Sequence, residues 1–156
     1  MRKFNPSGIS AEAFFEIVDL ARIERNHRAL AAFRRFSGDG YRKFDYKLPL
    51  GFEPRMVFLL ASGELRAELF CGRKGAWPTI NKLLQSGVLI TNGGTVPNLY
   101  PAEERDGFRI DVTVTSVQAH NPAAWFGLAH WLLGMLEDMI DTFEPIFDAH
   151  DGQNVE

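Results

Sequence analysis

The chain has 156 residues, of which 46% are hydrophobic, and its formal net charge at pH 7 is −3. This length is enough to bury a core, so we expect one domain over 1–156 with an ordered core from about 9 to 148. The lack of a long apolar run, of a secretory leader and of a second cysteine predicts a cytoplasmic protein with no membrane span and no internal disulfide.

Charge is distributed unevenly along the chain. Residues 1–47 carry a net charge of +4, residues 48–100 carry +2, and residues 101–156 carry −9. Because contacts to phosphate need positive charge, the acidic C-terminal region is a poor candidate for coating DNA. Its charge instead favours a basic partner, or the protein's own N-terminal third.

The first predicted helix begins at Ser10, whose hydroxyl suits an N-cap. Its apolar stripe shifts near residues 24–26 and resumes through Phe33. This shift predicts either a kink or two consecutive helices, because one straight helix would not keep both stripes on one core. The glycine-containing segment 37–40 should end the helical region.

Two further helices follow. Trp77-Pro78 predicts the start of a short helix, since proline is favoured in the first turn. Asn121-Pro122 predicts the start of a long amphipathic helix, with an apolar stripe from Trp125 to Phe143. Pro145 should bend or end this last helix.

Strands are indicated where apolar residues alternate or form short runs. The segments are 41–48, 56–61, 65–71, 88–91 and 108–118, with a turn at Ser62-Gly63 and a loop from Asn92 to Pro101. The pattern predicts an α+β fold: an antiparallel sheet of about five strands with helices packed on it, in the order α-β-β-β-α-β-β-α.

Two basic segments are candidates for binding anions or nucleic acid. The loop containing Arg73 and Lys74 joins a strand to a helix start, where backbone amides attract anions. Residues 22–47 are basic and include aromatic side chains, and their candidate contacts are Arg34, Arg35 and Arg42. The alternatives are a solvated turn for the first, and pairing with acidic residues of the last helix for the second.

Apolar residues outside the predicted core are candidates for binding a protein. Val96, Leu99 and Tyr100 lie in the predicted loop, and Trp131 lies outside the main stripe of the last helix. Long loops often carry binding surfaces, and a tryptophan at the edge of a core is either a packing residue or part of an interface.

Catalytic signatures are weak. Asp45-Tyr46-Lys47 matches half of a nuclease metal site, which would need Glu68 or Asp111 on a neighbouring strand. The four histidines and Cys71 lack the spacing of metal ligands. We therefore predict no catalytic residue, no metal ligand and no cofactor, with Cys71 as a buried apolar residue.

The C-terminal half resembles an α+β domain known as domain of unknown function 4268, which accompanies bacterial restriction and defence proteins. The similarity covers about residues 56–147 by motif spacing. The shared features are the segment Glu64 to Leu69, the short helix through Leu83-Leu84, and Trp125, Trp131-Leu132 and Phe143-Glu144-Pro145. The resemblance implies a bacterial or phage origin and an association with defence, and it brings no catalytic residues.

The predicted order of elements is also similar to that of class I type III secretion chaperones, small acidic dimers that bind extended segments of other proteins. Together, these features favour a non-catalytic protein-binding module of the inhibitor, immunity, chaperone or defence accessory type. The alternatives are a nucleic-acid-binding accessory domain and a metal-dependent, nuclease-like enzyme. We expect another protein as the partner. A homodimer and binding of nucleic acid are the alternatives, and no association with a membrane is expected.

Overall fold

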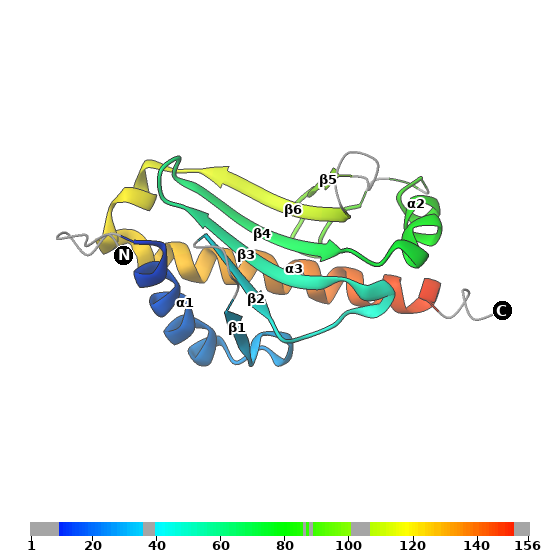
Figure 1. Cartoon of the computed structure of the whole chain (residues 1–156), viewed down its shortest axis with the longest axis horizontal. Helices are drawn as coiled ribbons and strands as arrows, with labels where there is room; N and C mark the ends of the chain where they lie inside the picture. The colour runs from blue at the N-terminus through cyan, green and yellow to red at the C-terminus, as the bar shows by residue number, and fades with distance from the viewer. Residues whose placement is uncertain (1–9, 36–39, 86, 88, 101–106, 152–156) are drawn as a thin grey trace.

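A computed structural model describes residues 10–35, 40–85, 87, 89–100 and 107–151. It shows a six-stranded antiparallel sheet in the order β1-β2-β3-β4-β6-β5, with helices packed on one face (Figure 1). The main elements are α1 Ala11–Arg25, β1 Phe33–Arg35, β2 Tyr41–Phe44, β3 Glu53–Leu59, β4 Glu64–Cys71, α2 Trp77–Gln85, β5 Asn98–Tyr100, β6 Phe108–Thr115 and α3 Trp125–Asp151. The predicted α+β class and antiparallel sheet are confirmed, with one strand more than expected.

The core lies between the sheet and the helices α1 and α3. Met56, Ala67 and Val112 are aligned across β3, β4 and β6 on the helix-covered face. Phe14 of α1 stacks on Phe58 of β3 with their ring centroids 4.1 Å apart. In the described part of the chain, the opposite face of β3, β4 and β6 carries no helix, and α3 runs behind the sheet (Figure 1). Among the described helices, none is both long enough and apolar enough to cross a membrane.

The predicted helix starts are confirmed by capping contacts. The Ser10 hydroxyl accepts a hydrogen bond from the Ala13 N–H at 3.1 Å. The Asn121 side chain accepts from the Ala123 N–H at 3.2 Å, in a 3₁₀ turn that leads directly into α3. The first backbone N–H groups of a helix have no carbonyl acceptor within the helix, and each of these side chains supplies one. Serine and asparagine are therefore typical of helix starts.

The expectation of a helical region extending through Phe33 is wrong. Asn26 adopts a left-handed conformation (φ 55°) and donates its N–H to the Arg22 carbonyl, so α1 ends at Arg25. A 3₁₀ turn at Arg28–Leu30 follows, and Phe33–Arg35 then pairs with β2. Pairing with a neighbouring strand therefore outweighs the helical spacing of the apolar residues in this segment.

The expected strand at 88–91 is not formed at its described residues, and the fifth strand lies inside the expected loop. Residues 98–100 pair with Arg109–Asp111 as β5, at the edge of the sheet. Thr91 begins a tight turn instead, as its N–H donates to the Thr95 carbonyl at 2.8 Å.

The last helix continues through Pro145 to Asp151 instead of ending there. Phe147, beyond the proline, is fully buried and stacks on Phe52 with a centroid distance of 4.5 Å. Proline removes one backbone donor, to the carbonyl of Asp141. Pro145 and Asp141 are both exposed, so water can replace that donor, while burial of Phe147 holds the last turn in place.

Basic side chains near the end of α1 pair with carboxylates of α3. Arg25 forms a bidentate pair with Glu137, with both hydrogen bonds at 2.8 Å. Arg28 pairs with Asp141 at 3.1 Å and with Glu144 at 2.5 Å. Pairing between the basic N-terminal third and the acidic last helix is therefore observed at these two arginines.

Asp141 should make folding dependent on pH. Burial opposes ionisation of this carboxyl, but hydrogen bonds with His27 and Arg28 outweigh it and hold its pKa below the usual value. Such a carboxyl contributes stability above its unfolded pKa of about 3.9, and this is lost as the pH falls through the folded pKa. We expect the unfolding free energy of the wild type to fall more steeply than that of Asp141→Asn between about pH 5 and pH 3. Urea denaturation at a series of pH values measures this, and parallel curves would contradict it.

Candidate functional site

The loop between α2 and β5 is fixed to α3 by hydrogen bonds. The Asn92 N–H donates to the Thr142 hydroxyl at 2.8 Å, and the Gly93 N–H donates to the Asp138 carboxylate at 3.1 and 3.2 Å. A Cβ at Gly93 would lie 2.7 Å from an Asp138 oxygen, so a larger residue here would require the Asp138 carboxylate to shift. The loop therefore has a defined position on the helix.

The same loop is closed internally by a short turn. The Thr91 N–H donates to the Thr95 carbonyl, and the Thr95 N–H donates to the Thr91 hydroxyl at 3.0 Å. Gly94 takes a left-handed conformation (φ 86°) that glycine adopts without strain. Ile90 and Val96 are the residues that flank this closed turn, one at each end.

Ile90 and Val96 are exposed aliphatic side chains, with exposed fractions of 53% and 60%. Leu99 and Trp131 are half-buried and pack against the core. We call residues 90–96 the apolar loop. It presents an exposed apolar side chain at each end of a turn held by hydrogen bonds, and such preorganisation favours protein binding.

The four predicted partner-binding residues fall on different faces. Val96 is exposed on the apolar loop. Leu99 is aligned with the buried Ile110 and so faces the helix-covered side, where Trp131 also packs. Tyr100 faces the other side, where the Arg109 guanidinium lies 4.2 Å from its ring centroid. The structure thus places Val96, Leu99 and Trp131 on the helical side of the sheet and separates Tyr100 from them.

A rival apolar pair lies on α1. Leu20 and Ile23 are 65% and 61% exposed. Their backbone is an ordinary helix, and single exposed aliphatic residues on helices are common. The apolar loop differs because it lies outside regular secondary structure and its backbone is held by hydrogen bonds to α3.

The face of the sheet without a helix carries a network of paired charges. Arg66 lies 3.0 Å from Glu68, and Arg109 lies 2.7 Å from Asp111. Glu68 is 2% exposed and Asp111 is fully buried, and these two carboxylates are neighbours across β4 and β6. Burial raises the pKa of Glu68 in spite of the neighbouring Arg66. Both carboxylates are paired with arginines, so they are part of the charge network that stabilises this face of the sheet.

The predicted half-site for a nuclease metal is not completed by this network. Asp45 is exposed just after β2, whereas Glu68 and Asp111 are buried beneath arginine side chains. In the ranges that the structure describes, no group of three or more acidic, histidine or cysteine side chains could hold a metal ion.

Cys71 and the histidines have structural contacts. The thiol of Cys71 is buried and donates to the Leu50 carbonyl at 3.2 Å, and burial raises its pKa. His27 lies 2.9 Å from Asp141, and His120 lies 2.7 Å from the Leu60 carbonyl. Burial dominates the environment of the Cys71 thiol even though Arg73 lies nearby.

The structure brings three of the predicted basic residues to neighbouring positions, because Arg35 of β1 is aligned with Arg42 of β2 and Arg34 precedes Arg35. Arg34 and Arg35 belong to β1, and the Arg42 guanidinium lies over the Phe15 ring at 4.4 Å on the helix-covered side. Arg73 and Lys74 are exposed after β4, and the Lys74 ammonium lies 5.9 Å from the Trp77 ring centroid. Arg34, Arg35 and Arg42 thus belong to the β1–β2 edge, whereas Arg73 and Lys74 follow the central strand β4.

Ile90 was not among the residues predicted to contact a partner, because the segment 88–91 was assigned to a strand. The signal that could have identified it is the Asn92-Gly93 pair, a common turn sequence between flanking apolar residues. That pair indicates a turn just after Ile90, and the observed three-residue loop 92–94 closes between Thr91 and Thr95.

Comparison with protein-family models, with curated proteins and with solved structures gave no match for this chain.

Proposed function

We propose that this protein binds another protein through the apolar loop and is not an enzyme. The observation that supports this most is the exposure of Ile90 and Val96 at the two ends of a turn whose backbone α3 holds by hydrogen bonds. Preorganised loops bind with a smaller loss of conformational entropy, so more of the contact energy appears as affinity.

Ile90 and Val96 alone would contribute only a modest part of the free energy of binding. Full burial of an exposed valine or isoleucine contributes about 1.5–3 kcal/mol. Because both side chains are already about half-buried, covering them would contribute about 2 kcal/mol together, or roughly thirtyfold in the dissociation constant. A stable complex therefore needs further contacts, which Leu99 and Trp131 at the edge of the core can supply.

The role of the complex rests on the two sequence resemblances. They favour an inhibitor, immunity, chaperone or defence accessory protein in the cytoplasm of a bacterium or in a phage. In each of these roles, the protein acts by covering a surface or an extended segment of its partner, which an apolar surface can do without chemistry.

Site-specific photo-cross-linking tests this proposal. A photoreactive phenylalanine analogue would be placed at position 96 of the full chain, expressed in the native cell, and the products identified by mass spectrometry. We expect one major cross-linked protein from position 96, and loss of that product when Ile90→Asp is added, because the charge would have to be buried in the contact.

Matched controls are available in the same chain. Leu20 and Val117 are apolar and 65% and 84% exposed, so the same analogue at these positions measures non-specific cross-linking. Equal yields from position 20 or 117 would contradict the proposal. Cross-links only between two copies of this chain would also overturn it, in favour of a homodimer contact.

A further inference from the structure

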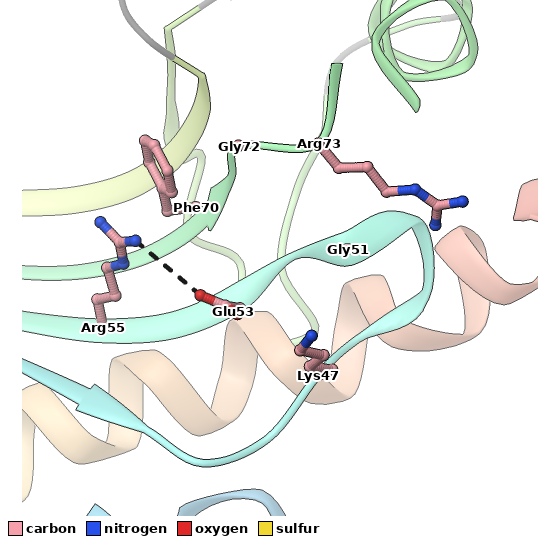
Figure 2. A pocket seen from close by; sticks show the side chains of 7 residues that line it. All are labelled: Lys47, Gly51, Glu53, Arg55, Phe70, Gly72 and Arg73. Atoms are coloured by element: carbon pink, nitrogen blue, oxygen red, sulfur yellow. Dashed lines mark ion pairs between the residues drawn. The ribbon is translucent and has the colours of Figure 1, made fainter. Parts of the chain in front are cut away.

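A surface pocket lies near the end of the sheet, on a different part of the molecule from the apolar loop. Its volume is about 340 Å³, which is at the lower end of the range for small-molecule sites. It is lined by Lys47, Gly51, Glu53, Arg55, Phe70, Gly72 and Arg73 (Figure 2). Three of these side chains are basic and one is acidic.

Lys47 and Arg73 lie on either side of Gly51, at one end of the pocket (Figure 2). Both side chains are exposed, and neither forms an ion pair with another residue in the described ranges. They come from segments that follow β2 and β4, so the antiparallel pairing of β2, β3 and β4 brings them together. Both cations therefore line the same pocket, with the Arg73 side chain extending away from Glu53, Arg55 and Phe70 (Figure 2).

Among the described residues that line the pocket, the one acidic side chain is already paired with other cations. Glu53 lies 2.6 Å from the Lys43 ammonium and 3.9 Å from the Arg55 guanidinium. The Arg55 guanidinium also lies 4.1 Å from the centroid of the Phe70 ring, which holds it in place. Glu53 thus leaves the charges of Lys47 and Arg73 uncompensated, and the lining residues keep a net charge of +2.

The wall between these two cations depends on a glycine. Gly51 has a φ of 88°, which glycine adopts without strain. A Cβ at this position would lie 3.2 Å from both Cβ and Cδ of Arg73. The absence of a side chain therefore lets the stem of Arg73 lie against the backbone beside the pocket.

From this geometry we propose that the pocket binds a phosphate group carried by a small phosphomonoester. A phosphomonoester carries about −1.5 to −2 charges at pH 7, which matches the net charge of the lining, whereas one carboxylate would leave it half neutralised. Arginine binds phosphate oxygens through a planar fork, and lysine binds them as a point charge, so the two residues are complementary.

A nucleic acid strand fits the same surface less well. Binding of a single strand relies on aromatic rings on which bases stack. The rings of Phe70 and Tyr100 on this face are each covered by a guanidinium, from Arg55 and Arg109. A single phosphate needs no stacking ring, and the charge of Glu53 in the pocket is already offset by Lys43 and Arg55.

The test is a titration of the full chain with inorganic phosphate and with glycerol 3-phosphate at constant ionic strength, followed by NMR of the backbone amides. We expect saturable shifts at Gly51 and Gly72. Arg73→Ala and Lys47→Ala should each weaken binding about tenfold, since hydrogen bonds to charged groups contribute about 1.5 kcal/mol or more. Arg73→Lys should lose less than Arg73→Ala, because it keeps the charge.

Lys82→Ala, which removes an exposed lysine of α2 outside the pocket, is the control and should bind as the wild type does. The amide spectrum of each variant also shows whether it is folded. Shifts that do not saturate, or an unchanged affinity in folded Arg73→Ala, would overturn the proposal. Tighter binding of a short single-stranded oligonucleotide than of glycerol 3-phosphate would overturn it too. None of these outcomes bears on the apolar loop.

Discussion

Replacing Phe58 with alanine should lower the free energy of unfolding by about 3–5 kcal/mol. Phe58 is fully buried on β3. It stacks on Phe14 of α1 and meets the ring of Trp125 of α3 edge-on, at a centroid distance of 5.7 Å. Its removal would leave a cavity where the sheet and both helices meet, and aromatic pairs add to the loss. Chemical denaturation followed by circular dichroism measures the change.

Phe126→Ala is the matched control for this prediction. Phe126 is 49% exposed at the start of α3, where its ring contacts His130 edge-on. We expect its replacement to lower the free energy of unfolding by less than about 1 kcal/mol, because little apolar area is lost and no closed cavity is formed. Similar losses in the two variants would mean that the core does not lie where the three elements meet.

Asp111→Ala should lower the free energy of unfolding by about 3 kcal/mol, the second large effect. The carboxylate is fully buried on β6 and pairs with Arg109. It also accepts hydrogen bonds from the Asn98 amide at 3.1 Å and the Thr113 hydroxyl at 3.0 Å. Removing it would leave an arginine without its partner and would release the side chain that links β6 to the edge strand β5.

Asp148→Ala is the control, since Asp148 is exposed near the end of α3. Its replacement should change the free energy of unfolding by no more than about 0.5 kcal/mol. Hydrogen exchange at the β5 amides should increase in Asp111→Ala alone. An unchanged stability in that variant would show that the charge network on the open face does not hold the sheet edge.

Features set by neighbouring residues were predictable from the sequence. The caps at Ser10 and Asn121 depend on side chains within three residues of the helix start, and both are observed. The three-strand meander was also predictable, because alternation with a period of two follows directly from the strand backbone. Burial of Cys71 followed from the same alternation.

Features set by distant contacts were missed. Phe33 has a helical spacing from preceding apolar residues, but its backbone pairs with Phe44 of β2. Pro145 is a local signal for a helix end, yet packing of Phe147 on Phe52 carries the helix past it. The position of the edge strand was missed because β5 has only three residues, too few for a periodic pattern.

The candidate sites also contain some residues that are visible in the sequence and others that depend on distant contacts. Val96 could be singled out because an aliphatic residue in a polar loop is visible in the sequence. Its partner Ile90 and the anchoring Thr142 depend on a turn and on a contact across about 50 residues. The positions of Lys47 and Arg73 at the same pocket depend on strand register, which one sequence does not reveal.

The cross-link yield from position 96, relative to positions 20 and 117, tests the central claim most directly. The proposed binding surface predicts one dominant partner protein from position 96, little product from the other two positions, and loss of the product in Ile90→Asp. A comparable yield from all three positions, or a product that persists in Ile90→Asp, would show that the apolar loop is not the binding surface.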